Sequence, residues 1–189
     1  MTHPTATPIA TADPARPPLD AGARVSAVTG ADVRIRRAGP LDAELVDTMV
    51  REIARHEDSL GDVVAEPEEW RRMLTRDDVE VFIATDGVHA LGYASTTRRL
   101  NLWLARDAIA LDDLYVRESA RDRGIGRQLM IAVARRAAVD DLTVVWGARL
   151  DNEAAHRFYT RLGAHLTTKV VAAWAPEGYS WTRDDAPEG

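Results

Sequence analysis

The strongest pattern of hydrophobic and polar positions lies between residues 109 and 139. Residues 109–116 form an apolar run that only Asp112 and Asp113 interrupt, which is typical of a buried strand. Further along, apolar side chains recur every four positions, at Ile125, Leu129, Val133 and Ala137, with Met130 and Ala134 beside them. This spacing predicts a helix that buries one face.

The turn between this strand and this helix has the composition of an anion site. Gly124 and Gly126 have no Cβ, so a ligand phosphate can approach the backbone closely. The first amides of a helix have no partner within it and point at whatever lies before them. Arg121, Arg123 and Arg127 add positive charge around the turn. We therefore expect a pyrophosphate to bind here.

Two common nucleotide motifs do not fit this turn. The Walker motif needs a Lys-Ser/Thr pair after the glycines, and this chain has none there. The dinucleotide fingerprint needs a third glycine at the position of Leu129. Two glycines alone also fit an ordinary strand-to-helix connection, so the interpretation needs a second, independent match.

A second segment supplies that match. Residues 142–146 read as another buried strand, and Asn152 then stands where a helix cap is expected, with Glu153 in the first turn. Apolar side chains share one face of the predicted helix, and Gly163 ends it. These side chains are Ala155, Phe158, Tyr159 and Leu162.

The remaining segments complete one domain. Residues 1–31 are rich in Ala, Thr and Pro without apolar periodicity, which predicts a flexible tail. We expect the folded domain at 32–183, followed by a short C-terminal tail at 184–189. Its other predicted elements are a strand at 33–37, a helix after Pro40 built on Leu41, Leu45, Met49 and Ile53, a short helix from Pro67, a hairpin at 79–85 and 88–97, and two closing strands within 165–181.

Composition narrows the chemistry. The chain of 189 residues has no cysteine, which excludes disulfides, thiol catalysis and zinc–thiolate sites. A formal charge of −6 argues against nucleic acid as the main partner and is compatible with cationic substrates. No apolar run approaches the length of a membrane span, and the first residues lack a secretory pattern. We expect a cytoplasmic protein with no membrane partner.

Both segments resemble one family. Residues 121–126 read Arg-x-x-Gly-x-Gly, and residues 152–164 read Asn-x-x-Ala-x-x-Phe-Tyr-x-x-x-Gly-Ala. They are similar to the coenzyme A pyrophosphate loop of the GNAT superfamily of N-acetyltransferases and to the segment after its fifth strand. The resemblance covers about residues 33–182. It implies an α/β (α+β) fold with a mixed, mostly antiparallel sheet flanked by helices and splayed between strands four and five.

Within the superfamily, three strings are closest to the diamine and polyamine acetyltransferases. They are Ile53 to Glu57, Leu111 to Val116, and Tyr159 to Ala164. The same strings also occur in relatives with other acceptors, so they favour this subgroup without fixing the acceptor.

The resemblance also implies roles for residues. Acetyl-CoA is the expected co-substrate, without a metal. Tyr159 matches the general acid that protonates the coenzyme A thiolate, and a backbone amide near Leu114 to Val116 matches the oxyanion donor. Asn152 is expected both to cap its helix and to lie close to coenzyme A. The positions expected to contact the cofactor are Leu114, Tyr115, Val116, Arg121, Asp122, Arg123, Gly124, Ile125, Gly126, Arg127, Asn152 and Phe158.

Acidic residues are the candidates for the acceptor side. Strict strand alternation places Asp112 and Asp113 on opposite faces, so only one can face the acceptor. Asp113 matches the substrate-binding aspartate of the polyamine group. Glu57 is either an amine ligand, a water-mediated base or a solvated acid at a helix end. Three further residues each have two interpretations. His56 is either a base or polar surface, and Trp70 and Trp103 are either pocket walls or core.

The predicted reaction is acetyl transfer to a primary amine by direct attack in a ternary complex. A small-molecule amine such as a polyamine or aminoglycoside is the favoured acceptor. The alternatives are a protein or peptide acetyltransferase acting on lysine or an N-terminus, and a non-catalytic module that senses acyl-CoA. A homodimer is possible, and the sequence neither requires nor excludes it.

Overall fold

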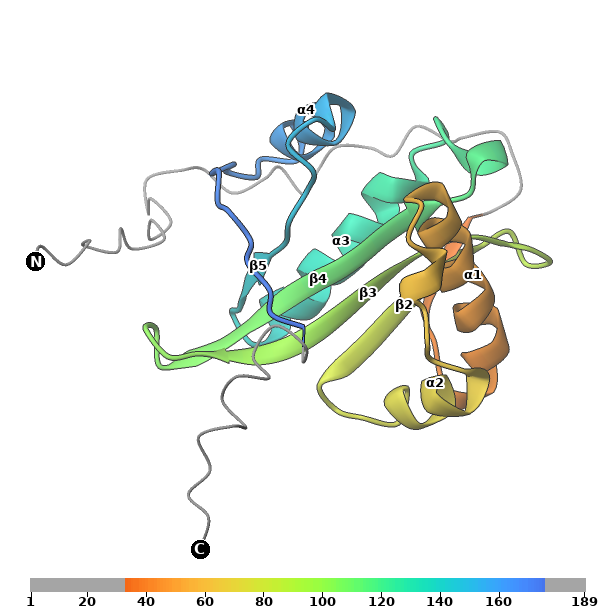
Figure 1. Cartoon of the computed structure of the whole chain (residues 1–189). Helices are drawn as coiled ribbons and strands as arrows, with labels where there is room; N and C mark the ends of the chain where they lie inside the picture. Colours follow the sequence, from red (N-terminus) through yellow and green to blue (C-terminus); the bar gives the residue numbers. More distant parts are fainter. Residues whose placement is uncertain (1–32, 176–189) are drawn as a thin grey trace, which may run out of the picture. The chain divides into compact units, whose positions relative to one another are not determined.

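The computed structural model describes residues 33–175, whose strands form a single sheet with helices on both sides (Figure 1). The strands are β1 (Arg34–Arg37), β2 (Val79–Thr85), β3 (Ala90–Asn101), β4 (Arg106–Val116) and β5 (Thr143–Val145). They lie in the order β1-β2-β3-β4-β5. The first four are antiparallel neighbours, and β5 runs parallel to β4. The predicted fold class is confirmed.

Each face of the sheet has its own hydrophobic cluster. The helices are α1 (Ala43–His56), α2 (Pro67–Met73), α3 (Ile125–Val139) and α4 (Glu153–Arg161). Three short 3-10 turns lie at Pro40–Asp42, Leu60–Asp62 and Glu118–Ala120. One cluster joins α3 and Tyr159 of α4 to the sheet, and the other joins α1 and Leu74 to it. Side chains of β4 therefore face α3 on one side and α1 on the other.

The helical pattern of α3 matches the prediction. Ile125, Leu129, Val133 and Ala137 are all at most 3% exposed, so this face packs on the sheet. Ala134, expected beside them, is exposed. In the first helix, Leu41 is also exposed, because α1 begins only at Ala43.

Strands β4 and β5 pair only where they start. Ala108, Ile109 and Ala110 pair with Thr143, Val144 and Val145, and β4 then continues to Val116 without β5 beside it. Figure 1 shows the chain leaving β5 toward α4 while β4 runs on in another direction. The predicted splay between the fourth and fifth strands is therefore present, and it exposes one edge of Leu111–Val116.

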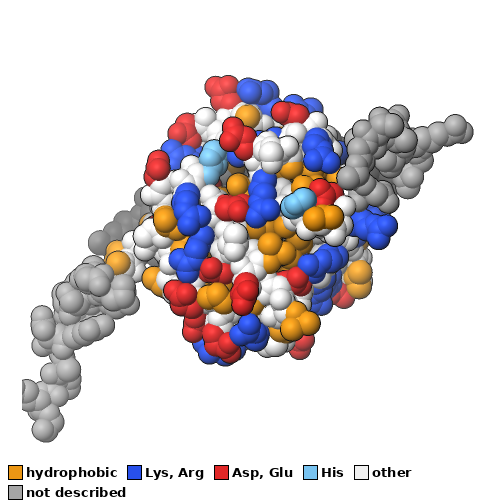
Figure 2. Space-filling view, turned by 90° about the vertical axis from the view of Figure 1, so that its right-hand side faces the viewer, with side chains coloured by type: hydrophobic (Ala, Val, Ile, Leu, Met, Phe, Trp, Pro, Cys, Tyr) orange, Lys and Arg blue, Asp and Glu red, His pale blue; other side chains and the backbone are white. Residues whose placement is uncertain are grey.

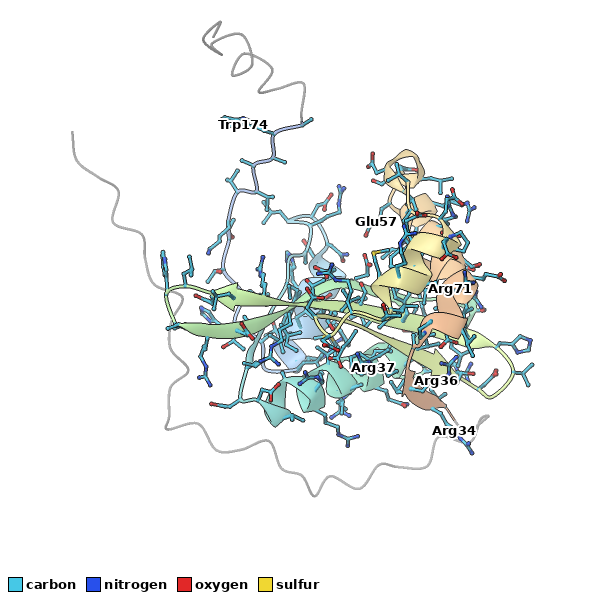
Figure 3. All side chains as sticks on the ribbon, turned by 90° about the horizontal axis from the view of Figure 1, so that it is seen from below. Arg34, Arg36, Arg37, Glu57, Arg71 and Trp174 are labelled. Atoms are coloured by element: carbon cyan, nitrogen blue, oxygen red, sulfur yellow. The ribbon has the colours of Figure 1, made fainter. Side chains whose placement is uncertain are left out.

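The two predicted closing strands are not formed within 165–175, and residues 176–181 lie outside the described part. A strand needs a neighbour to bond with, and no strand pairs with this segment among the described residues. Val170, Val171 and Trp174 are at least 75% exposed. In Figure 3 Trp174 lies well away from the sheet.

Among residues 33–175, no helix has both the length and the apolar composition that crossing a bilayer requires.

Candidate functional site

The start of α3 has the geometry of an anion site. Gly124 precedes the helix with φ +73°, a left-handed conformation that favours glycine. No side chain caps this end, and the first backbone hydrogen bond runs from Gln128 N to the Gly124 carbonyl, at 3.1 Å. The amides before Gln128 therefore remain available to a ligand.

The arginines around this turn are not neutralised by carboxylates. Within residues 33–175, Arg121, Arg123 and Arg127 form no salt bridge, whereas Arg36, Arg51 and many others do. The one hydrogen bond that the Arg121 side chain donates within the described residues goes to the Val116 carbonyl, at 3.2 Å. Guanidinium groups that form no salt bridge within the protein can form charge-assisted hydrogen bonds to a bound phosphate.

A hollow of about 300 Å³ lies beside the same turn. It is lined by Asp86, His89, Ala90, Leu91, Arg117, Ser119, Ala120 and Arg123. The β2–β3 turn and the β4–α3 connection therefore meet next to the predicted pyrophosphate site.

The C-terminal end of β4 is held in place by close packing and an ion pair. A Cβ added to Gly92 would lie 2.3 Å from the Tyr115 carbonyl oxygen, so only glycine fits at that crossing. Arg117 forms two hydrogen bonds to Glu52 of α1, at 2.8 and 2.7 Å, and a third to the Ala90 carbonyl. These contacts fix the backbone where β4 leads into the glycine turn.

Helix α4 packs directly against the glycine turn. Asn152 caps it, because its Oδ1 accepts a hydrogen bond from Ala155 N at 3.0 Å, as predicted. A Cβ added to Gly126 would lie 3.6 Å from Phe158 and 3.8 Å from Val116. The predicted cofactor residues of β4, α3 and α4 therefore come together at the splay.

Tyr159 is buried among aromatic rings. Its ring lies 5.1 Å from Trp146, edge to face, and 5.3 Å from Phe158. Burial raises the pKa of the phenol, so Tyr159 remains protonated over a wider pH range than an exposed tyrosine. No hydrogen bond to its hydroxyl occurs among the described residues. A protonated phenol with a free hydroxyl is suited to donate a proton.

A β-bulge changes the orientation expected for the two aspartates. Ser95 pairs with Asp113 and Thr96 pairs with Leu111, so Asp112 is an extra residue in β4. Burial raises the pKa of Asp112, a hydrogen bond from Thr97 lowers it, and the charge of Asp113 raises it. Leu111 and Leu114, which flank the two aspartates, both pack in the cluster beneath α3, so Asp112 and Asp113 both lie on the opposite face. The prediction of opposite faces was wrong, because a bulge breaks strict alternation.

Asp113 is held in one orientation. The Ser95 hydroxyl donates to Asp113 Oδ2 at 2.7 Å and accepts from the Asp113 amide at 3.1 Å. On the same face of the sheet, the neighbouring cross-strand pair is Tyr93 with Tyr115, whose ring centroids lie 6.2 Å apart. Both tyrosines contribute to the cluster beneath α1, so Asp113 opens onto that side of the sheet.

Glu57 lies at the end of α1, on the same side of the sheet (Figure 3). It is exposed. Burial raises the pKa of Tyr93 most and the charge of Asp113 comes next, while the charge of Glu57 makes a smaller contribution in the same direction. It also contributes to raising the pKa of Arg149, whose main partner is Asp151. Arg149, Leu150 and Asp151 line a surface hollow of about 430 Å³ in the β5–α4 connection. Glu57 is thus close enough to act electrostatically on both Tyr93 and Arg149.

Three weaker candidates do not join this group. Trp103 is 67% exposed in the β3–β4 turn, at the far end of β4 from Asp113. Trp70 packs on the cluster beneath α1, which supports its assignment to the core. His56 is exposed on the last turn of α1. Within the described range, no three His, Asp or Glu residues are placed to hold a metal ion.

Sequence reasoning missed Ser95, Tyr93 and the Glu52–Arg117 pair. Ser95 and Tyr93 belong to a hairpin whose existence was predicted, but only the register places them beside Asp113 and Tyr115. The alternation of β3 was a usable signal for their common face.

Comparisons with known proteins agree with this geometry. A sequence model of the acetyltransferase (GNAT) family matches residues 47–164. A D-amino-acid N-acetyltransferase of Saccharomyces cerevisiae is 36% identical over 90 residues, which are 46% of this chain and 54% of that protein. The chain therefore matches only about half the length of this curated relative.

Solved acetyltransferases share the fold. An aminoglycoside acetyltransferase from an uncultured soil metagenomic sample, in complex with sisomicin, superposes with a TM-score of 0.67 at 17% identity, over 76% of this chain and 95% of that chain. An aminoglycoside N-acetyltransferase in complex with CoA superposes with a TM-score of 0.62 at 22% identity, over 78% of this chain and 97% of that chain. An integron cassette protein of V. cholerae superposes with a TM-score of 0.66 at 25% identity, over 82% of this chain and 100% of that chain.

Proposed function

The chain belongs to the GNAT acetyltransferase family, and from this premise we propose that it acetylates the primary amine of a small molecule that binds at Asp113. Family membership and the similarity to known acetyltransferases support acetyl-CoA-dependent N-acetyl transfer. The identity of the amine and the roles of individual residues are the proposal.

On the donor side, acetyl-CoA binds with its pyrophosphate at the start of α3. The free amides before Gln128 and the guanidinium groups of Arg121, Arg123 and Arg127 support this placement. The pantetheine arm then follows the exposed edge of β4 between Leu114 and Val116, toward Tyr159 and Phe158. Asn152 supports the position of α4 through its cap.

The chemistry is a direct transfer. An ammonium near pKa 10 must first lose a proton, and Glu57, through water, is the candidate base. The amine nitrogen attacks the thioester carbon, and a β4 amide between Leu114 and Val116 stabilises the oxyanion. The carbon–sulfur bond breaks and the nitrogen loses its second proton to water, which leaves the amide. The thiolate takes the proton of Tyr159, which solvent restores. The chain has no cysteine, so a thiol acyl-enzyme is excluded.

One observation carries the acceptor assignment, namely the fixed carboxylate of Asp113 on the open part of β4. A partly buried carboxylate is costly without a cation, and no arginine or lysine pairs with Asp113 among the described residues. An acceptor ammonium would supply that charge. Asp112 on the same face and Glu57 nearby favour a cationic acceptor such as a polyamine or aminoglycoside.

Two other functions remain as alternatives with their own tests. A lysine side chain or N-terminus of a peptide also provides a primary amine, and the fold does not choose between these acceptors. Figure 2 shows acidic and basic side chains intermixed on the side of α1 and α2, without a broad surface of one charge for a charged peptide. A non-catalytic acyl-CoA sensor would need no buried acid such as Tyr159.

The deciding experiment measures free-thiol release from acetyl-CoA with a panel of amines. The panel contains polyamines, aminoglycosides, amino acids of both hands and a lysine-containing peptide, with a no-amine blank. We expect release with a class of small amines. Release with the peptide alone would favour the peptide acetyltransferase. Coenzyme A binding by calorimetry without any turnover would favour the sensor.

A further inference from the structure

The hydroxyl of Tyr93 is a buried polar group without a partner. The residue is 0% exposed, and its Oη forms no hydrogen bond within the described part of the chain. Folded proteins pair nearly all such groups, because an unpaired buried donor lowers stability. The ring fills the cluster beneath α1, which a phenylalanine would do equally well. The hydroxyl therefore needs a separate explanation.

The strand register places this hydroxyl next to Asp113. Tyr93 pairs with Tyr115 and Ser95 pairs with Asp113, so Tyr93 and Asp113 are diagonal neighbours on one face. Aromatic side chains reach diagonal neighbours across strands. Burial raises the pKa of Tyr93, and the charge of Asp113 is the next largest cause. Asp113 is thus the carboxylate that acts most strongly on this phenol.

We propose that Tyr93 is a positioning residue for the acceptor, which donates a hydrogen bond to Asp113 when that carboxylate binds the acceptor ammonium. Ser95 already holds Asp113 Oδ2. With Tyr93 as a second donor on the protein side, the remaining oxygen lone pairs point toward the ammonium. The inference rests on the proposed function, because it requires Asp113 to bind the acceptor.

This role differs from proton transfer. The raised pKa keeps Tyr93 protonated across the working pH range, so it acts as a donor and never as the base. Its removal should therefore weaken acceptor binding without changing the shape of the pH profile.

The test compares Tyr93→Phe with the wild type, using an amine that the wild type acetylates. We expect the KM for the amine to rise about three- to tenfold, as for one hydrogen bond to a charged group. The kcat, the KM for acetyl-CoA and the pH profile should stay the same. The melting temperature should stay the same or rise, because the variant removes an unpaired buried group. A purely structural tyrosine would leave the amine KM unchanged.

A double-mutant cycle shows whether Tyr93 acts through Asp113. In an Asp113→Asn background, Tyr93→Phe should add little to the amine KM, because the carboxylate that it orients is gone. The same fold-change in both backgrounds would overturn the proposal, as would an unchanged amine KM in Tyr93→Phe alone. A wild type that acetylates no amine would overturn the proposed function as well, so the two failures are distinguishable.

Discussion

The start of α3 lies next to the C-terminal end of β4, and the α1 face belongs to β4 itself, but the chain builds the two differently. The start of α3 comes from consecutive residues, in which Gly124 adopts its turn conformation and the helix amides follow at once. The α1 face comes from residues far apart in sequence, such as Ser95 and Asp113, which only the strand register brings together. A local motif therefore describes the proposed donor side, and the proposed acceptor side requires the tertiary structure.

This difference predicts which property each substitution changes. Changes in the turn should affect acetyl-CoA, changes on the α1 face should affect the amine, and Tyr159 should affect the rate with both substrates saturating.

The largest expected effect is that of Tyr159→Phe. Loss of a general acid should lower kcat about a hundredfold or more, with both KM values little changed. Because burial raises the pKa of Tyr159, wild-type kcat should hold to about pH 10 and fall only above it. The measurement is kcat against pH at saturating substrates, with an enzyme-free blank for thioester hydrolysis. A variant with wild-type kcat would remove Tyr159 from the mechanism.

Asp113→Asn should come next in size. Losing the charge that faces the ammonium should raise the amine KM about 10- to 100-fold and leave the KM for acetyl-CoA unchanged. Asp112→Asn is the matched comparison, because Asp112 lies on the same face but Ser95 holds Asp113 and not Asp112. Steady-state kinetics with each substrate varied in turn would measure both. Equal effects of the two variants would contradict the assignment of the acceptor site to Asp113.

Gly124→Ala should alter the donor side. A left-handed conformation costs an alanine roughly 1–2 kcal/mol, so we expect a lower free energy of unfolding by about that amount. If the turn relaxes, the helix amides move away from the pyrophosphate, and the KM for acetyl-CoA should rise several-fold. Urea unfolding and kinetics measure the two effects. A rise in the KM for the amine alone would contradict the assignment of this turn to acetyl-CoA binding.

The smallest effect is expected from Arg123→Gln. A partly exposed guanidinium contributes modestly to phosphate binding, so the KM for acetyl-CoA should rise about threefold at low salt and less at high salt. Arg71→Gln on α2 is the control, since Arg71 pairs with Glu68 away from the turn (Figure 3). If both variants respond alike, the effect comes from the overall charge and not from the turn.

Much of the fold could be predicted because helices and hairpins have local patterns. The buried face of α3 and the Asn152 cap follow from spacing and residue type alone. The closing strands could not be predicted reliably, because apolar residues such as Val170 and Val171 favour a strand but do not supply a neighbour for it. The orientation of Asp112 could not be predicted either, since a bulge depends on how two strands meet and not on the sequence of one.

Because Asp112 is the extra residue of a bulge, deleting this one residue can alter the proposed acceptor side without disturbing the rest of the strand. Because Thr96 pairs with Leu111 and Ser95 pairs with Asp113, deleting residue 112 would leave both pairings in register. The hydrophobic pattern of β4 would be preserved, and the strand would lose one negative charge and its local bend. The gain or loss of a single codon could thus change the proposed acceptor side while the turn before α3 stays the same.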